Sequence, residues 1–360
     1  MRVGRFIYGV LARAAPVLLI TSVITFLLTI FAEQEPADLL LGEAATAEAV
    51  AELNHELGRD RPILVQFLDW SGGALQGDLG ASWFTGIPVV ATIADRLPVS
   101  LSVAALALLI AVLLGGVAGV AAALKRGSWV DRLVTLAAST LATLPPFVVS
   151  IGFILLFGVV IPILPTGGYV PFSQSSVGWL ASIILPAAAL ALEAAADIAR
   201  QLRTALVRTY EENFVTGARL RGLSRPRILF RHALPQAAGP ALATLGLQVP
   251  RLIGGAIIAE QIFSLPGLGL MAYEGAMQGD QPVVLGAVMV TVVVVLLSTL
   301  IIDLILLAIT PTARRDSRSP NQKRRLKGPP DWANSHAGAA AVSTDADLAG
   351  LGASNGRRPL

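Results

Sequence analysis

Long apolar runs constrain this chain more than any other feature of its sequence. No charged residue lies between Arg132 and Glu193, and the polar, turn-rich segment 165–176 divides that stretch into two runs. A helix needs about 20 apolar residues to cross the hydrocarbon core of a bilayer. The runs are continuous rather than alternating, which favours helices over the strands of a membrane barrel. We therefore expect an all-α integral membrane protein.

Six such runs predict six transmembrane helices, at residues 9–31, 99–124, 135–161, 177–198, 237–259 and 283–309. Lysine and arginine gather at the N-terminus, after the second and fourth runs, and after the sixth. The short loops after the third and fifth runs have neither. Because such residues accumulate on the cytoplasmic side, both termini are expected to be cytoplasmic. No small-residue cleavage site follows the first run, so we interpret it as a span rather than a signal peptide.

The segments outside the membrane differ in character. Residues 1–8 are predicted to be a cytoplasmic stub, and residues 32–98 a large extracytoplasmic segment. In that segment Thr46 can cap a helix that Gly58 ends, and Pro62 can begin another. Two interpretations stay open for it: an amphipathic cap on the membrane surface, or a docking surface for an external partner. Residues 312–360 lack apolar periodicity, which predicts a disordered basic cytoplasmic tail.

The composition gives little support to catalysis or metal binding. The chain is 54% hydrophobic and 14% charged, has no cysteine, and carries three histidines far apart in sequence. Disulfides and thiolate metal sites are thus excluded, and no metal-ligand motif is present. The net charge of +3 comes from residues that flank the apolar runs, so it indicates orientation in a membrane rather than nucleic-acid binding. We expect no catalytic site and no metal site.

The loop between the fourth and fifth runs is the most specific segment. We expect a first helix that ends near Arg221, with Gly222 in the left-handed conformation after it. Ser224 can cap a second helix that has Pro226 in its first turn, and Pro235 should break that helix before the fifth span. The result is a basic helical hairpin. It would either dock on a cytoplasmic partner or lie on anionic lipid.

This loop resembles the signature loop of binding-protein-dependent ABC importer permeases, the EAA loop. The family pattern is Glu-Ala-Ala, then a glycine, then Leu-Pro. Here Thr216-Gly217-Ala218, Gly222 and Leu234-Pro235 stand at that spacing. The Glu and the first Ala are replaced, as is typical of the peptide/nickel branch. Further segments similar to that branch are 57–62, 77–82, 96–98, 260–269 and 280–284, so the resemblance covers about residues 1–313. The long external segment is typical of the first of the two permease types in that branch.

The resemblance implies a type I ABC importer permease in the bacterial cytoplasmic membrane, with a core over 99–311 and a coupling loop over 199–236. Its implied partners are a second homologous permease, two ATPase subunits and an extracytoplasmic substrate-binding protein. ATP and Mg²⁺ would be bound by those ATPases, since this chain has no Gly-x-x-x-x-Gly-Lys-Ser/Thr motif. Di- or oligopeptides are the implied cargo, with nickel chelates as an alternative. The implied coupling residues are Thr216, Gly217, Ala218, Arg219, Arg221, Gly222, Arg225, Arg227, His232, Leu234 and Pro235.

Other residues are candidates for the translocation path or for gating. Prolines and glycines supply breaks and close contacts, and charges inside a span usually face a partner or a water-filled path. These candidates are Pro145, Pro146, Pro250, Arg251, Gly254, Gly255 and Glu260. We also expect Asp197 and Arg200 to pair.

Two other classes of function remain to be weighed. An ion-coupled secondary transporter or channel would use Glu193, Asp197 and Asp303 as a relay, but it has no need of the docking loop. An intramembrane enzyme would need a nucleophile with a base, or a metal motif, and the apolar runs contain neither histidine nor cysteine.

Overall fold

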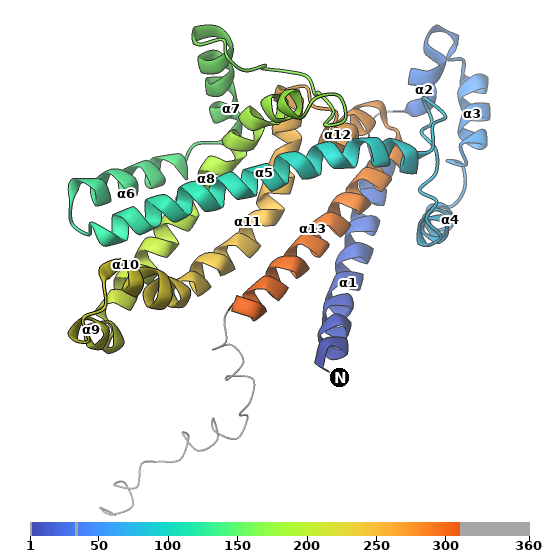
Figure 1. Ribbon diagram of the computed structural model, residues 1–360. Coiled ribbons are helices and arrows are strands. Elements are labelled where there is room, and N and C mark those ends of the chain that lie inside the picture. The colour runs from blue at the N-terminus through green and yellow to red at the C-terminus, as the bar shows by residue number, and fades with distance from the viewer. Residues whose placement is uncertain (1, 33–34, 310–360) are drawn as a thin grey trace, which may run out of the picture. The chain divides into compact units, whose positions relative to one another are not determined.

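The computed structural model describes residues 2–32 and 35–309, and side chains for 14–32 and 35–305. The described chain is helical, and its only β feature is an isolated bridge between Ala81 and Pro88. The five longest helices are α1 (Arg2–Ile30), α5 (Val89–Leu124), α8 (Ser176–Glu211), α11 (Leu234–Ile262) and α13 (Gln281–Ile309). Figure 1 shows α1 running beside α13, and α5 crossing α8. The predicted tail at 312–360 lies outside the described residues.

The span count depends on how two of the elements are interpreted. Four helices are long and apolar enough to cross a membrane: α5, α8, α13, and α11 together with the turns that precede it from Arg225. A bent pair would make a fifth span. The apolar part of α1 with described side chains, Ala14–Ile30, is shorter than the other four. Six spans and cytoplasmic termini therefore stay predictions.

The third predicted span is broken in the middle. In place of a straight crossing over 135–161, α6 (Trp129–Leu141) and α7 (Pro146–Ile154) meet at a bend of 103°, and a π-turn, η2 (Leu155–Val160), follows α7. Pro146 has no amide hydrogen, and Pro145 disfavours the helical conformation of the residue before it. A break at this proline pair was expected from the sequence, whereas the size of the bend was not.

Several helix boundaries differ from the predicted ones. α6 begins at Trp129 rather than at 135, and α8 ends at Glu211 rather than at 198, so the first part of the predicted coupling loop 199–236 belongs to α8. α1 begins at Arg2, so the residues predicted as a separate stub belong to the first helix. α5 begins at Val89, which places the last part of the predicted external segment inside that helix. The apolar pattern marks only the apolar part of a helix, so the predicted bounds leave out polar turns at the helix ends.

The core of the bundle is built on α8, which packs against α5 along small residues. Ala107, Ala111, Gly115 and Gly119 follow one another at four-residue spacing on α5, and all are buried. A Cβ on Gly115 would lie 2.6 Å from the carbonyl oxygen of Ala195, and one on Gly119 would lie 2.9 Å from that of Ala199. The two helices therefore run in the same direction with their backbones in close approach, as small-residue stripes allow in membrane proteins.

The external segment is helical and is fastened to the bundle. It contains α2 (Pro36–Leu41), the 3₁₀ turn η1 (Gly42–Ala44), α3 (Ala47–Glu56) and α4 (Ile63–Leu75). The Thr46 hydroxyl accepts a hydrogen bond from the amide of Ala49 at 3.2 Å, which confirms the predicted cap. Phe67 of α4 packs edge-on against Phe26 of α1, with ring centroids 5.2 Å apart.

The remaining helices are short and lie at the ends of the long ones. α12 (Leu268–Gln278) joins α11 to α13. α9 (Asn213–Leu220), α10 (Arg225–Ile228) and the π-turn η3 (Leu229–Ala233) join α8 to α11. Figure 1 shows α9 and α10 at the opposite end of the long helices from α12.

Candidate functional site

The basic hairpin forms where the chain turns from α8 into α11. α8 ends at Glu211, and Glu212 has an extended backbone that lets α9 start in a new direction. Gly222 has a φ of +76°, as expected for the residue after a helix end, and Ser224 holds the N-cap position of α10. The hydroxyl of Ser224 makes no capping hydrogen bond. The hairpin has its own small core, formed by Val215, Ala218 and Ile228, with Tyr210, Phe214 and Leu223 around it.

The predicted break at Pro235 was wrong. The chain stays helical from Arg225 to Ile262, and the π-turn η3 takes the place of an interruption. A π-turn widens the helix by one residue, and this accommodates a proline ring without ending the helix. The hairpin is thus rigidly continuous with the fifth predicted span.

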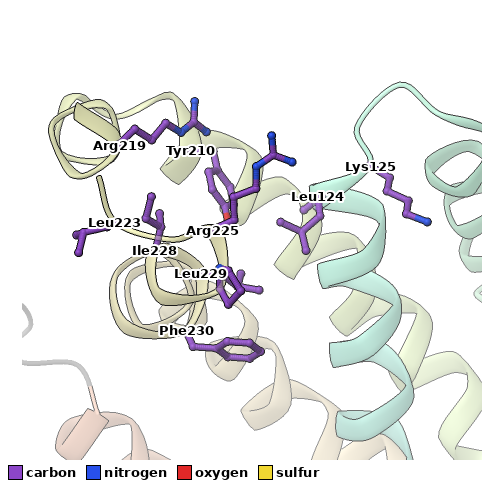
Figure 2. A pocket seen from close by; sticks show the side chains of 11 residues that line it. Leu124, Lys125, Tyr210, Arg219, Leu223, Arg225, Ile228, Leu229 and Phe230 are labelled. Carbon is purple, nitrogen blue, oxygen red and sulfur yellow. The ribbon is translucent and has the colours of Figure 1, made fainter. Parts of the chain in front are cut away.

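A basic hollow of about 870 Å³ lies between this hairpin and the end of α5 (Figure 2). Three of its lining residues are cationic and none is acidic: Lys125, Arg219 and Arg225. The Arg219 guanidinium stands 5.9 Å from the ring centre of Tyr210, a cation–π distance. The remaining wall is mostly apolar and consists of Ala123, Leu124, Leu223, Pro226, Ile228, Leu229 and Phe230. Phe230 is 66% exposed, so the hollow offers an aromatic side chain as well as charge.

The predicted coupling residues fall into three groups by exposure. Ala218 is buried in the hairpin core. Gly217, His232 and Leu234 are partly buried. The exposed group is Thr216, Arg219, Arg221, Gly222, Arg225, Arg227 and Pro235. Only Arg219 and Arg225 of these line the hollow.

Sequence reasoning missed the part of this site that comes from α5 and α8. Lys125 is far from the hairpin arginines in the chain, and only the packing of α5 on α8 brings it to them, whereas Tyr210 lies nine residues before Arg219. An ion pair of Arg126 with Glu211, 2.5 Å between Nη1 and Oε1, joins the two helix ends. Asp131 accepts hydrogen bonds from Nε and Nη2 of Arg203, at 2.5 and 2.8 Å, and so fixes the start of α6 on α8. A cluster of lysine and arginine in loops on one side was the available signal for Lys125.

A second polar group lies within the spans, between α8 and α11. Asp197 accepts a hydrogen bond from Gln248 Nε2 at 2.6 Å and pairs with Arg200, as expected. Arg251 Nη1 lies 3.7 Å from Asp197 Oδ2 and 3.9 Å from Glu193 Oε1. Asp303 is exposed on α13 and forms no ion pair with any described residue. The structure therefore brings Glu193 and Asp197 to Arg251, but not to Asp303.

The other path candidates take different positions. Pro145 and Pro146 form the bend between α6 and α7. Pro250 and Gly254 are exposed beside Arg251 on one face of α11, and a Cβ on Gly254 would meet open space. Gly255 is turned toward α8, where a Cβ would come within 3.2 Å of Leu190.

Glu260 is buried at the opposite end of α11 from the hairpin and organises the start of α12. Its carboxylate accepts hydrogen bonds from Ser100 Oγ at 2.6 Å and from the amide of Leu270 at 3.0 Å. The hydroxyl of Ser100 in turn accepts from the amide of Leu268 at 2.8 Å. A Cβ on Gly267 would overlap the carboxylate. The motif 260–269 thus joins α5, α11 and α12 through one acid.

A similar contact anchors the external segment. Asp280 is buried just before α13, and it accepts hydrogen bonds from Ser82 Oγ at 2.5 Å and from the amide of Trp83 at 3.3 Å. Ser82 closes the motif 77–82, and Asp280 opens the motif 280–284. Two segments that were recognised separately in the sequence therefore form one joint.

Removing the Glu260 carboxylate should destabilise the protein. In Glu260→Ala, the hydroxyl of Ser100 and the amide of Leu270 lose their acceptor in a buried place, which costs about 3 kcal/mol or more. Glu274→Ala is the control, because it removes only the partly exposed ion pair with Arg96, worth at most about 1 kcal/mol. Thermal unfolding of the detergent-purified protein measures both. Equal losses for the two variants would contradict a structural role for Glu260.

No cofactor or metal site is evident in the part of the chain whose side chains are described. Nowhere in that part do three histidine, aspartate or glutamate side chains gather closely enough to hold a metal ion.

Comparison with known proteins identifies the family. Residues 111–315 match the family model of the binding-protein-dependent transport system inner membrane component, and residues 3–104 match the model of its N-terminal part. A Brucella abortus protein named as a peptide transport system permease is 37% identical over 305 residues, 85% of this chain and 97% of its own length. The glutathione transport system permease protein GsiC of Salmonella typhimurium is 33% identical, over 83% of this chain and 95% of its own length.

Solved structures give a more distant likeness. An inward-facing structure of the MetNI methionine ABC transporter is 18% identical, with a TM-score of 0.49 over 61% of this chain and 96% of that one. The two family matches together cover residues 3–104 and 111–315, which include the signature loop and the five further segments recognised in the sequence. This multi-pass protein of the cytoplasmic membrane belongs to the family of binding-protein-dependent transport system inner membrane components, the permeases of ABC importers.

Proposed function

We propose that this chain is one of two permease subunits of an ATP-driven importer that carries di- or oligopeptides into the cytoplasm. Two ATPase subunits, which bind ATP and Mg²⁺, and an external substrate-binding protein would complete the complex. The names of the relatives support the cargo, since one refers to peptide transport and another to glutathione, itself a small peptide. The chain would take no part in ATP chemistry.

The observation that carries this proposal is the basic hairpin with its hollow. Transport driven by a separate ATPase needs a rigid element that passes the motion of that ATPase to the spans. α10, η3 and α11 provide it, because they form one uninterrupted helical path from Arg225 to Ile262. A displacement of the hairpin then moves the far end of α11, where Glu260 holds α12. Arg219 and Arg225, on either side of Gly222, would receive an acidic or polar edge of the ATPase.

The path for the cargo would follow the open face of α11. Pro250, Arg251 and Gly254 lie on that face, and a charge inside a span needs water or a polar partner beside it. We expect Arg251→Ala to lower uptake while the complex still assembles. The bend at Pro145–Pro146 would let α7 move relative to α6.

Reconstitution tests the proposed function. The chain is co-expressed with a candidate second permease, ATPases and binding protein, purified from membranes as a complex, and placed in liposomes. We expect uptake of labelled trialanine into the liposomes. This uptake should require ATP on the side of the membrane that holds the ATPase, and ionophores should leave it unchanged. Uptake that collapses with the ion gradient and needs no ATPase would favour an ion-coupled transporter instead.

A further inference from the structure

One face of α11 is left uncovered within the described chain, and it carries a single charge. The exposed residues on this face recur at helical spacing and are Leu247, Pro250, Arg251, Gly254 and Ile258. The side chain of Arg251 is 63% exposed. At 1.5 Å per residue it lies about 16 Å along the axis from the end of α11 at Ile262, inside the fifth predicted span at 237–259.

Arg251 and the three charges near it, Glu193, Asp197 and Arg200, are not equally satisfied. Asp197 is held on both sides, by Gln248 and by Arg200, and Gln248 itself is buried. Arg251 and Glu193 lie near each other, but the 3.9 Å between Nη1 and Oε1 is an ion-pair distance and not a hydrogen bond. Neither of these two side chains makes a hydrogen bond with any residue of the described chain. Arg251 therefore has donors, and Glu193 has acceptors, available on the open face.

An arginine with free donors inside a membrane span is costly against lipid. Water or a polar partner must therefore meet this face of α11. The cluster of Glu193, Asp197, Arg200 and Arg251 has no net charge, so a partner with one strong charge would leave it unbalanced. A dipolar partner, with one positive and one negative group, matches it best.

We propose that Arg251 and Glu193 form a contact site for the free end groups of a peptide in transit, Arg251 for the carboxylate and Glu193 for the ammonium group. This inference rests on the proposed peptide cargo. When no peptide is present, the two side chains neutralise each other across 3.9 Å. When both end groups of a peptide reach the pair, each side chain exchanges a loose ion pair for a charge-assisted hydrogen bond, and the total charge stays zero. Such a site lets charged ends cross without binding them tightly.

The test compares peptides that differ only at their ends, in the reconstituted complex with its binding protein. The probes are trialanine, its C-terminal amide and its N-acetyl form, each at a concentration that saturates the binding protein. Arg251→Gln should lower uptake of trialanine about tenfold, as expected for one charge-assisted hydrogen bond, but lower uptake of the amide less than about twofold. Glu193→Gln should show the same selectivity for trialanine over the N-acetyl form.

Two control variants separate the proposed contact at Arg251 from a general loss of positive charge. Arg251→Lys keeps the charge and should retain more than about a third of the uptake. Arg132→Gln removes an exposed arginine from α6, away from this cluster. If the binding protein accepts neither blocked peptide, the ratio of trialanine uptake by Arg251→Lys to that by Arg251→Gln decides, with about threefold or more in support and equality against.

Three results would overturn the inference: equal losses for all three peptides, no loss at all, or a complex that no longer assembles. The last would mean that Arg251 pairs with the second permease. Absence of ATP-dependent trialanine uptake by the unmodified complex would count against the peptide cargo itself, and it is visible before any variant is compared.

Discussion

Replacing Gly115 with valine should prevent this protein from accumulating in the membrane as a folded chain. Gly115 lies where α5 and α8 come closest, and its ideal Cβ would stand 2.6 Å from the carbonyl oxygen of Ala195 and 2.8 Å from the Cβ of Ile198. Backbone atoms cannot turn aside, so the helices must separate along their whole contact. Overpacking of a core usually costs 1–3 kcal/mol, and we expect about 3 kcal/mol or more here because the first clash is with a backbone.

The next residue provides a matched control. Gly116 is also a glycine, and it lies next to Gly115 in α5 at almost the same depth, yet a Cβ there would meet nothing within 4 Å. Gly116→Val should therefore change the thermal midpoint of the purified protein by only a few degrees. Fluorescence size-exclusion chromatography and thermal unfolding of both variants make the comparison. If the two behaved alike, the close approach of α5 and α8 would be wrong.

Reversing the charge of the basic hollow should abolish ATP-driven uptake. Arg219→Glu combined with Arg225→Glu changes two of the three cations there, and no acidic residue lines the wall to compensate. An ATPase surface complementary to the positive charge would then be repelled, and like-charge contacts cost several kcal/mol. We expect uptake to fall more than about tenfold and the ATPase to be lost from the purified complex, while the permease still inserts and unfolds at an unchanged temperature.

The control for this variant is Arg208→Glu. Arg208 is an exposed arginine near the end of α8, and it does not line the hollow. It should leave uptake within about twofold, since a single exposed charge outside a contact contributes little. If Arg208→Glu impaired uptake as strongly as the double variant, the effect would come from total charge on this side of the protein and not from the hollow.

The sequence predicted best those features of the fold that depend on residues close together in the chain. Gly222 has the positive φ that its place after a helix demands, and Thr46 caps α3 with its hydroxyl. Apolar runs located the long helices for the same reason, because burial in lipid acts on each segment separately. The predicted break at Pro235 was wrong, since a π-turn can accommodate a proline that would otherwise end a helix.

Contacts between distant segments were beyond the sequence. Nothing near Glu260 in the chain indicates that Ser100 donates to it, or that its carboxylate holds the first turn of α12. Lys125 joins the hairpin arginines only because α5 packs along α8. Likewise, the sequence offered Glu193 only as part of an ion relay, and its distance to Arg251 comes from the structure. The recognised motifs contained Glu260 but not Ser100, Lys125 or Glu193, and only the three-dimensional arrangement gave the pairing of these residues.

Cross-linking of the hairpin to an ATPase tests the central claim most directly. The chain has no cysteine, so one introduced residue is a unique probe. Leu220, at the end of α9, is 85% exposed, and Phe172, in the segment before α8, is 63% exposed. With a short maleimide–succinimidyl ester reagent, Leu220→Cys should be joined to the ATPase in isolated membranes, and Phe172→Cys should not. Labelling of Leu220→Cys by a membrane-impermeant maleimide added to intact cells, without any cross-link to an ATPase, would contradict the account.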